Sequence, residues 1–299
     1  MAKMTLFFHY VVYLLLRLFC GIINLIPYSM IRLFAKLLGS LFYYIHPPRR
    51  KIALENLNHA FGDEYTQNEI KYIARDSFKN LALLAVESIR IPKMLATFSD
   101  YVDIKNDQVI TEILKSGRGI ILLIAHYGNW ELMAVKAGLL KYPISAVGRP
   151  MKNKFIYRYI KRLRQKTGLK VLNKKGSAKE IIRELKSGRI LAILFDQYAG
   201  GSALPVKFFG RTAYTTPAVA QLALRTGAIV VPAFDVRNPN GKHTIHVETP
   251  LKTINTGNRA EDIKRNTELY NNILEKWIRK NPSQWFWFHK RWKLPRKYS

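Results

Sequence analysis

A histidine and a carboxylate lie five residues apart, directly after a run of apolar residues. The run is Ile120–Ile124, and the residues after it read AHYGNWE, so that the pair is His126 and Glu131. On a continuous helix of 3.6 residues per turn these side chains would point about 140° apart, so they can meet only if the chain turns between them. Gly128 permits such a turn, and Asn129 is a good helix N-cap, which places Glu131 in the first turn of a helix, facing back toward His126.

Such a pair is typical of general-base chemistry. A carboxylate that holds one imidazole nitrogen leaves the other nitrogen free to take a proton near neutral pH. Backbone N–H groups at the start of the helix are expected to bind a developing oxyanion. The same spacing also fits a plain structural role, in which a histidine at a strand end bonds a glutamate that favours the helix dipole. The spacing alone leaves both interpretations open.

The elements that must position this pair alternate between strand-like and helix-like segments. Strands are predicted at 119–125, 144–147, 190–195, 229–234 and 244–247. Helices are predicted from a capping box at Thr66 to about Arg90 and at 129–140, 154–167, 178–186, 217–226 and 259–279. This alternation predicts an α/β fold with a mixed, largely parallel central sheet flanked by helices. Ligands gather at the carboxyl ends of such strands, where His126 and the pair Asp196 and Gln197 are expected.

The charge of the chain indicates an anionic partner. Its 299 residues include 49 Lys and Arg against 20 Asp and Glu, a formal net charge of +29. Nucleic acid, a membrane surface, a phosphorylated substrate and an acidic protein would all suit this charge. Between Arg149 and Arg189 there are 15 basic and two acidic residues. The helix predicted at 154–167 carries its basic residues opposite its apolar side, a surface suited to an acidic carrier protein or to lipid phosphates.

Residues 1–48 are predicted to form a membrane anchor ahead of one α/β domain, 49–299. The segment Met4–Ile26 is mostly apolar, and no acidic residue precedes Glu55. This segment is long enough to span a bilayer, but Arg17 in its middle costs about 2.5 to 3.5 kcal/mol on insertion. A helix lying in the membrane interface is therefore an alternative to a spanning helix, and a helix buried in the domain is a third interpretation. Basic residues are more numerous on its C-terminal side, which puts the domain in the cytoplasm.

The C-terminal segment 282–293 reads PSQWFWFHKRWK and contains three tryptophans and two phenylalanines among basic residues. Aromatic rings beside basic residues are typical of an anchor at a membrane interface. Packing of a terminal tail against the domain is the alternative.

The residues do not favour a metal, a cofactor or a nucleophilic thiol. The single cysteine, Cys20, lies in the apolar N-terminal segment, excludes an internal disulfide and is a poor candidate for a catalytic thiolate. The histidines other than His126 are scattered, with His243 and His246 three apart on a predicted strand, so no metal-ligand set emerges. No nucleic-acid-binding motif accompanies the charge, and nucleic acid is not an expected partner.

The motif HYGNWE resembles that of the late lipid A biosynthesis acyltransferases of the lauroyl and myristoyl type, within the glycerolipid acyltransferase superfamily. The family motif is a histidine, four residues, and an aspartate or glutamate. Further similar features follow in the family's order between about Arg49 and Lys293: Arg49-Arg50 with Asn56-Leu57, Arg149-Pro150 with Asn153, Arg164 with Gly168, Asp196-Gln197, Val206–Gly210, Ala213 with Thr215 or Thr216, Val231-Pro232 and Trp287–Trp292. This ordered set is more specific than the His–Glu pair alone.

The resemblance implies acyl transfer from an acyl thioester, on acyl carrier protein or coenzyme A, to a hydroxyl of a lipid A precursor at the cytoplasmic face of the inner membrane. His126 would remove the proton of the hydroxyl, Glu131 would orient the imidazole, and the hydroxyl would attack directly without an acyl-enzyme. The residues expected to bind substrate are Asn129, Arg149, Arg164, Asp196 and Gln197. Another membrane glycolipid or a lysophospholipid is the alternative acceptor, and a nonenzymatic membrane-surface or nucleic-acid-binding protein is a distant third interpretation.

For two of these residues the role is open in more than one way. Arg149 is similar to an arginine that the superfamily uses near phosphate or the transition-state oxyanion, and its plain alternative is a member of a solvated basic face. Asp196 would line the acceptor pocket, hold Arg149 or Arg164, or cap a turn after its strand.

Overall fold

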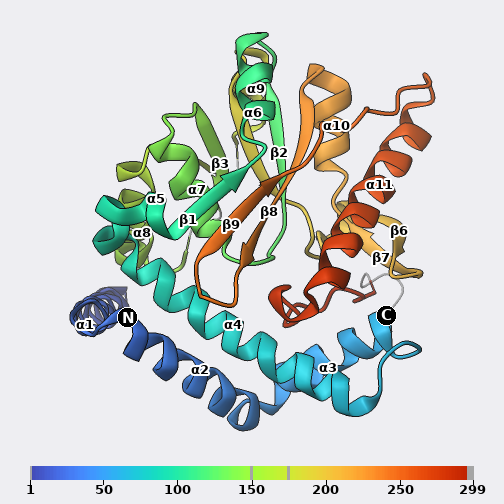
Figure 1. Cartoon of the computed structure of the whole chain (residues 1–299). Helices are drawn as coiled ribbons and strands as arrows, with labels where there is room; N and C mark the ends of the chain where they lie inside the picture. Colours follow the sequence, from blue (N-terminus) through green and yellow to red (C-terminus); the bar gives the residue numbers. More distant parts are fainter. Residues whose placement is uncertain (1, 149–150, 174–175, 295–299) are drawn as a thin grey trace.

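The computed structural model describes residues 2–148, 151–173 and 176–294 and has an α/β fold (Figure 1). Its helices are α1 (Ala2–Leu25), α2 (Tyr28–Ile45), α3 (Pro47–Phe61), α4 (Gln67–Met94), α5 (Phe98–Tyr101), α6 (Gln108–Lys115), α7 (Trp130–Leu139), α8 (Lys154–Lys166), α9 (Ala178–Lys186), α10 (Ala218–Thr226) and α11 (Arg259–Lys280), with the 3-10 turns η1 (Leu95–Thr97), η2 (Gly200–Ser202) and η3 (Pro282–Gln284). Its strands are β1 (Val102–Lys105), β2 (Ile120–Ile124), β3 (Ile144–Gly148), β4 (Lys170–Asn173), β5 (Ile190–Leu194), β6 (Leu204–Phe208), β7 (Arg211–Thr215), β8 (Ile229–Arg237) and β9 (His243–Val247).

The central sheet has seven strands in the order β1-β9-β8-β2-β5-β3-β4. The five strands from β8 to β4 run parallel to one another. Strand β9 pairs antiparallel with β8, and β1 pairs parallel with β9. Strands β6 and β7 form a separate antiparallel hairpin. The predicted mixed, largely parallel sheet flanked by helices is therefore confirmed.

Strand β2 is at the centre of this sheet and is apolar along its whole length because helices cover both faces. Successive side chains of a strand point to opposite faces. Accordingly, Ile121 and Leu123 pack in a core built with α3, α4, α10 and α11, whereas Ile120 and Ile124 pack in a second core with α6 and α7. The carboxyl end of β2 thus lies between two packed layers, which hold the loop that follows it.

The strands and helices predicted from the sequence are present, with boundaries shifted by a few residues at most. The capping box at Thr66 is formed: Glu69 Oε2 accepts from the Thr66 backbone N–H at 2.8 Å. Strands β1 and β4 and the β6–β7 hairpin were not predicted. Strands β1 and β4 lie at the edges of the sheet and are four residues long, and edge strands need few apolar residues. Strand β6 contains Pro205, and proline argues against a strand because it has no backbone N–H to donate to a neighbouring strand.

Helix α2 lies along α4, on the side away from the sheet (Figure 1). Its inward residues, Ile31, Ala35 and Gly39, are buried. The two helices approach so closely that a Cβ on Gly39 would lie 2.5 Å from the Cα of Lys79. The opposite face of α2 is apolar and exposed, and Leu37 has 60% of its surface accessible. That face therefore lacks a partner in the described chain.

Helix α1 contains a segment, Met4–Leu25, that is long and apolar enough to cross a membrane by length and composition. It nevertheless lies against the domain along much of its length. Near its start, Asn153 Nδ2 donates to the His9 carbonyl at 2.8 Å. At its end, Arg90 Nη1 donates to the carbonyls of Ile23 and Ile26, both at 2.7 Å. One side of α1 is thus fixed to α8 and α4, while its outer side is exposed and apolar.

The aromatic C-terminal segment is packed inside the domain. Trp285, Trp287 and Phe288 are each at most 3% exposed and belong to the core on the α4 side of the sheet. The 3-10 turn η3 follows α11 and directs the chain back over the carboxyl end of β2, where the Trp285–Tyr127 bridge forms. The interpretation of these rings as a membrane-interface anchor is therefore wrong, and the packed tail is what the structure shows.

Candidate active site at the carboxyl end of strand β2

The loop after β2 turns sharply at Gly128, as the sequence predicts. Gly128 has a φ of +58°, and a Cβ there would lie 2.0 Å from the carbonyl oxygen of Asp235, so both the backbone conformation and the space require glycine. Asn129 then caps α7, since its Oδ1 accepts from the backbone N–H groups of Glu131 at 3.2 Å and Leu132 at 3.4 Å. The turn and the cap set the directions of His126 and Glu131.

The carboxylate that holds His126 is Asp196. The Nδ1 atom of His126 lies 2.7 Å from Asp196 Oδ1, and the His126 backbone N–H donates to Oδ2 at 3.0 Å. Trp285 Nε1 donates to the same Oδ2 at 2.8 Å. Asp196 is 1% exposed, whereas the His126 side chain is 18% exposed. The aspartate is thus enclosed, and the imidazole reaches the surface of a cavity.

The pKa of Asp196 is lowered from its ordinary value. Burial acts against this shift because it disfavours the charged form. The positive charge of a protonated His126, together with the N–H donors from the His126 ring, its backbone and Trp285, outweighs burial. The group beside the imidazole is therefore a carboxylate, which favours the tautomer with the proton on Nδ1 and leaves Nε2 available as a base.

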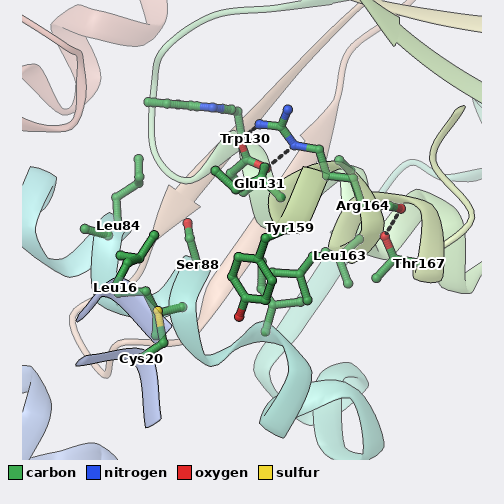
Figure 2. A pocket seen from close by; sticks show the side chains of 16 residues that line it. Leu16, Cys20, Leu84, Ser88, Trp130, Glu131, Tyr159, Leu163, Arg164 and Thr167 are labelled. Carbon is green, nitrogen blue, oxygen red and sulfur yellow. Dashed lines mark hydrogen bonds and ion pairs between the residues drawn. The ribbon is translucent and has the colours of Figure 1, made fainter. Parts of the chain in front are cut away.

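Glu131 points elsewhere, toward α8. Its carboxylate pairs with Arg164 through two bonds, from Nε to Oε2 at 3.1 Å and from Nη2 to Oε1 at 2.5 Å (Figure 2). This corrects the expectation that Glu131 holds the imidazole of His126 in this structure. The physical reason is that a guanidinium offers two parallel N–H donors to a carboxylate, a stronger match than one imidazole nitrogen.

The other residues expected at the site have different positions. Asn129 is fully buried, and its Nδ2 donates to Glu87 at 2.9 Å, so it positions the loop and does not line the cavity. Gln197 follows Asp196 and is half-buried, and no hydrogen bond within the described ranges joins it to these residues. Arg149 lies outside the described residues.

Four of the backbone N–H groups near the start of α7 are already engaged. Those of Gly128 and Asn129 donate to Gln284 O at 2.9 Å and Asp235 Oδ2 at 2.7 Å, and those of Glu131 and Leu132 donate to the Asn129 cap. These four groups are therefore not available for an oxyanion, and an oxyanion site at the helix start stays a prediction.

An apolar pocket of about 270 Å³ opens beside the Glu131–Arg164 pair. Its walls come from α1, α4, α7 and α8, and Figure 2 shows Leu16 and Cys20 of α1 on the side away from Arg164. Trp130 links this pocket to the histidine, because its ring lines both this pocket and the smaller cavity next to His126, and its centroid lies 4.8 Å from the imidazole.

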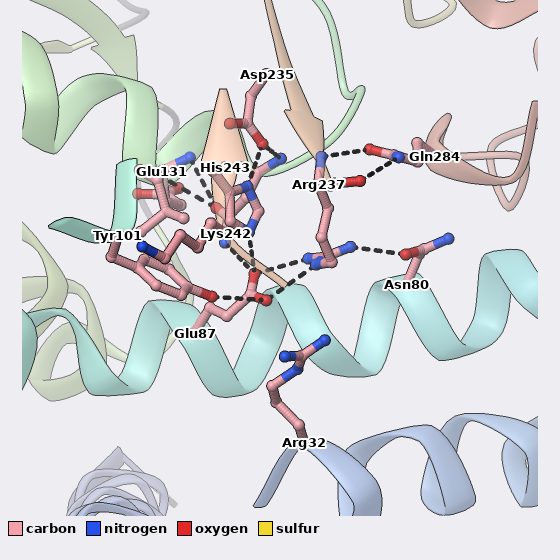
Figure 3. Close-up of polar contacts among 12 residues, drawn as sticks. Arg32, Asn80, Glu87, Tyr101, Glu131, Asp235, Arg237, Lys242, His243 and Gln284 are labelled. Atoms are coloured by element: carbon pink, nitrogen blue, oxygen red, sulfur yellow. Dashed lines mark hydrogen bonds and ion pairs between the residues drawn. The ribbon is translucent and has the colours of Figure 1, made fainter. Parts of the chain in front are cut away.

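A buried cluster of four charged groups supports the loop from behind (Figure 3). Arg237 donates to Glu87 through Nε at 2.9 Å and Nη2 at 2.7 Å. His243 Nδ1 lies 2.7 Å from Asp235 Oδ2, and its Nε2 lies 3.4 Å from Glu87 Oε2. Two carboxylates thus face two cations in the interior. Both carboxylates also accept from Asn129, so the cluster contacts the loop directly.

Burial acts against the charges of Glu87 and His243, but their pairing with opposite charges in the cluster outweighs it. Burial alone would raise the pKa of Glu87, yet the Arg237 guanidinium and His243 hold that pKa far below its usual range. Burial would likewise lower the pKa of His243, but the carboxylates of Asp235 and Glu87 raise it to about 9. Both partners therefore carry charge at neutral pH.

The profile of the family described as bacterial lipid A biosynthesis acyltransferase matches residues 2–294. The chain is similar to the lipid A biosynthesis lauroyltransferase of Escherichia coli, with 26% identity over 274 residues, 90% of this chain and 87% of the relative. The palmitoleoyltransferase of lipid A biosynthesis in the same organism is 23% identical over 279 residues, 90% and 86% of the two chains.

A further similar protein is the phosphatidylinositol mannoside acyltransferase of Mycolicibacterium smegmatis. It is 28% identical over 168 residues, which are 54% of this chain and 54% of that protein. The match thus spans about half the length of this relative, against most of the length of the two Escherichia coli enzymes.

Proposed function

We propose that this protein moves a fatty acyl chain from an acyl thioester to a hydroxyl of a lipid A precursor. The proposal proceeds from its family, since the chain belongs to the bacterial lipid A biosynthesis acyltransferases and is an acyltransferase. The observation that carries the proposal is the position of the oriented imidazole. His126, held by Asp196, lies beside Trp130, whose ring also lines an apolar pocket with one charged pair. This arrangement offers a base next to a site for a hydrocarbon chain.

In the proposed reaction His126 Nε2 takes the proton of the acceptor hydroxyl while the hydroxyl oxygen attacks the thioester carbonyl carbon. The carbon–sulfur bond then breaks, and the proton passes from His126 to the leaving thiolate, giving an ester and a free thiol. Asp196 holds the imidazole and stabilises its protonated form. The attack is direct, and no covalent acyl-enzyme forms.

The Glu131–Arg164 pair is proposed to bind the polar end of the substrates. Arg164 lines the pocket, and its side chain is 34% exposed, so the guanidinium is accessible to a phosphate or to the developing oxyanion. Glu131 keeps the guanidinium of Arg164 in place through the two hydrogen bonds between them. We propose Arg149 as a second cation with the same role, and Gln197 as a contact to the acceptor.

The donor is proposed to be an acyl carrier protein, with coenzyme A as the alternative carrier. The support is helix α8, which contains no acidic residue and leaves Lys154, Arg158 and Arg162 exposed, while other residues of the same helix line the pocket. A surface of this charge suits an acidic protein.

Membrane attachment is proposed through the outer faces of α1 and α2. Leu33, Leu37 and Leu41 follow one another at one-turn spacing on α2 and are each at least 53% exposed. An exposed apolar stripe of this length, flanked by basic residues, is typical of a helix bound at a lipid surface. We propose that the domain lies at the cytoplasmic face of the inner membrane, as the similarity to the lipid A biosynthesis acyltransferases implies.

One observation favours a second acceptor class. The 28% identity to a phosphatidylinositol mannoside acyltransferase suggests that the acceptor is another anionic membrane glycolipid. The chemistry at His126 would be the same, so only the acceptor differs between the two proposals.

Mass spectrometry of the acceptor tests this function. The purified protein in detergent is incubated with a lipid A precursor and either acyl carrier protein or coenzyme A loaded with chains of 12 to 16 carbons, with the His126→Gln variant as the matched inactive protein. We expect one acyl mass to be added by the wild type and none by the variant. A lipid A precursor left unchanged, with a phosphatidylinositol mannoside acylated in the same assay, would favour the second acceptor.

The single cysteine permits a separate test of the pocket as the acyl-chain site. Cys20 lines the pocket and is the only thiol in the chain. Dodecyl methanethiosulfonate forms a disulfide between Cys20 and its dodecylthio group and releases methanesulfinate. The attached dodecyl chain is expected to fill the pocket and reduce acyl transfer at least about tenfold, since it excludes the donor chain. Dithiothreitol should restore activity, and Cys20→Ala should be insensitive to the reagent. Full labelling by intact mass with unchanged activity would contradict this use of the pocket.

A further inference from the structure

The C-terminal segment after α11 lies directly on the loop that carries the histidine. The backbone N–H of Gly128 donates to Gln284 O at 2.9 Å, and that of Phe286 donates to His126 O at 2.9 Å. Between these two bonds, Tyr127 and Trp285 form an antiparallel bridge. Residues 284–286 therefore act as a short extra strand along the active-site loop, although they lie far from it in the sequence.

Within this segment one side chain reaches past the loop to the buried carboxylate. Trp285 is 3% exposed, and its Nε1 donates to Asp196 Oδ2 at 2.8 Å. The other oxygen of Asp196 faces His126 Nδ1 at 2.7 Å. The indole and the imidazole thus bind different oxygens of one carboxylate.

We propose that Trp285 is a positioning residue for acyl transfer, which acts on His126 through Asp196 by fixing the plane of the carboxylate. This inference rests on the proposed function. The two oxygens have separate partners, since Oδ2 accepts from the indole and the His126 backbone N–H, whereas Oδ1 accepts from the imidazole N–H. Without the indole, Oδ2 keeps only the His126 backbone N–H at 3.0 Å, so the carboxylate is held less firmly and turns more easily away from the imidazole.

The neighbouring Trp287 supplies a matched control. It is fully buried, its ring centroid lies 4.6 Å from that of Trp285, and its Nε1 donates to the Pro282 carbonyl at 2.7 Å. A Trp→Phe exchange at either position removes one buried N–H donor and similar volume. Only the exchange at Trp285 removes a donor to Asp196.

A double-mutant cycle tests the proposal. Trp285→Phe is expected to lower kcat about tenfold with little change in the KM of either substrate, because one charge-assisted bond to the orienting carboxylate is lost. In the Asp196→Asn background the same exchange should change kcat less than about twofold, since the group through which it acts is already altered. Trp287→Phe should change kcat by the same factor in the wild-type and the Asp196→Asn background. Equal losses from Trp285→Phe in both backgrounds would overturn the proposal, as would an unchanged kcat in a folded Trp285→Phe variant.

A second measurement does not depend on acyl transfer. The rate at which diethylpyrocarbonate modifies His126, followed by peptide mass spectrometry, is expected to fall about threefold in Trp285→Phe and to stay unchanged in Trp287→Phe, because the reagent needs an unprotonated Nε2. If the wild type forms no product but this difference is found, the proposed acceptor or reaction fails and the positioning role of Trp285 stands. Suppose that product forms, that Trp285→Phe leaves the modification rate of His126 unchanged, and that the double-mutant cycle shows no coupling between Trp285 and Asp196. The proposed role of Trp285 is then wrong.

Discussion

Replacing Asp196 with asparagine is expected to lower kcat of acyl transfer by about 10³-fold or more while the protein stays folded. The reason is the tautomer of His126. Two N–H groups, from the His126 backbone and from Trp285, point at Asp196 Oδ2, so the amide oxygen of an asparagine must occupy that position. Its NH₂ group then faces His126 Nδ1, which has to accept, and the ring proton moves to Nε2. An imidazole protonated at Nε2 cannot take a proton from the acceptor.

Glu131→Gln is the matched comparison, since it makes the same carboxylate-to-amide exchange at the other candidate partner. It weakens the bond to Arg164 but leaves the His126–Asp196 pair intact, so we expect a loss of about tenfold, mainly in the KM of the substrates. The two variants are compared by steady-state kinetics and thermal unfolding. A larger kcat loss for Glu131→Gln than for Asp196→Asn would show that Glu131 turns to the imidazole when substrate binds, as the resemblance to the family motif implies.

The sequence predicts the strand, turn and helix start around the candidate site well, because these depend on local rules. An apolar run with β-branched residues makes a central strand, and Gly128 and Asn129 end it and start α7 by their backbone preferences. These effects act within a few residues, so reading neighbouring residues suffices. Asp196 was likewise expected at the same edge of the sheet as His126, because both directly follow predicted strands, and in the structure these two strands pair side by side.

The partners within the site were harder to predict because they depend on tertiary contacts. Spacing allows Glu131 to face His126, but it does not show that Arg164, 33 residues later, competes for that carboxylate. The contact of Trp285 with Asp196 was missed for the same reason, although the segment that contains Trp285 stands out as aromatic. Its composition suits a membrane interface and a buried core equally, and only the fold of η3 over β2 decides between them.

The buried cluster behind the loop was also missed. Glu87 lies in a helix whose sequence reads as amphipathic, and Arg237 and His243 lie near the ends of two strands. Within any one of these elements, a charged residue considered alone looks like an ordinary surface residue. A signal was nevertheless present, since His243 and Asp235 both fall next to strands predicted to be buried, where charged residues are rare unless paired.

Replacing Glu87 with glutamine is expected to destabilise the fold by about 3 to 5 kcal/mol, a fall in Tm on the order of 10 °C. The exchange removes the charge that faces both Arg237 and His243 and leaves two cations buried beside one carboxylate. Glu64→Gln is the control, because it breaks an ion pair with Arg279 in which both side chains are more than 40% exposed. Exposed pairs contribute about 0 to 1 kcal/mol, so its Tm should hardly change. The measurement is thermal unfolding in detergent.

The pH dependence of the Tm difference between the wild type and Glu87→Gln tests whether the cluster is charged. The pKa of His243 is raised to about 9 in the folded protein, from about 6.5 in the unfolded chain. Its contribution to stability is therefore fully present below pH 6.5 and is lost as the pH rises through 9. Glu87 has a pKa held far below its usual range, so its contribution persists throughout this window.

The Tm of the wild type should accordingly fall between pH 6.5 and 9 more steeply than that of Glu87→Gln, in which His243 has lost one of its two carboxylates. The Tm difference between the two proteins is then largest near pH 6.5 and narrows toward pH 9. A difference that is large but constant over this range would mean that His243 is neutral throughout and that Arg237 alone pairs with Glu87. In that case Asp235 would hold the histidine only by a neutral hydrogen bond, and the loop at Asn129 would depend on one ion pair and not on two.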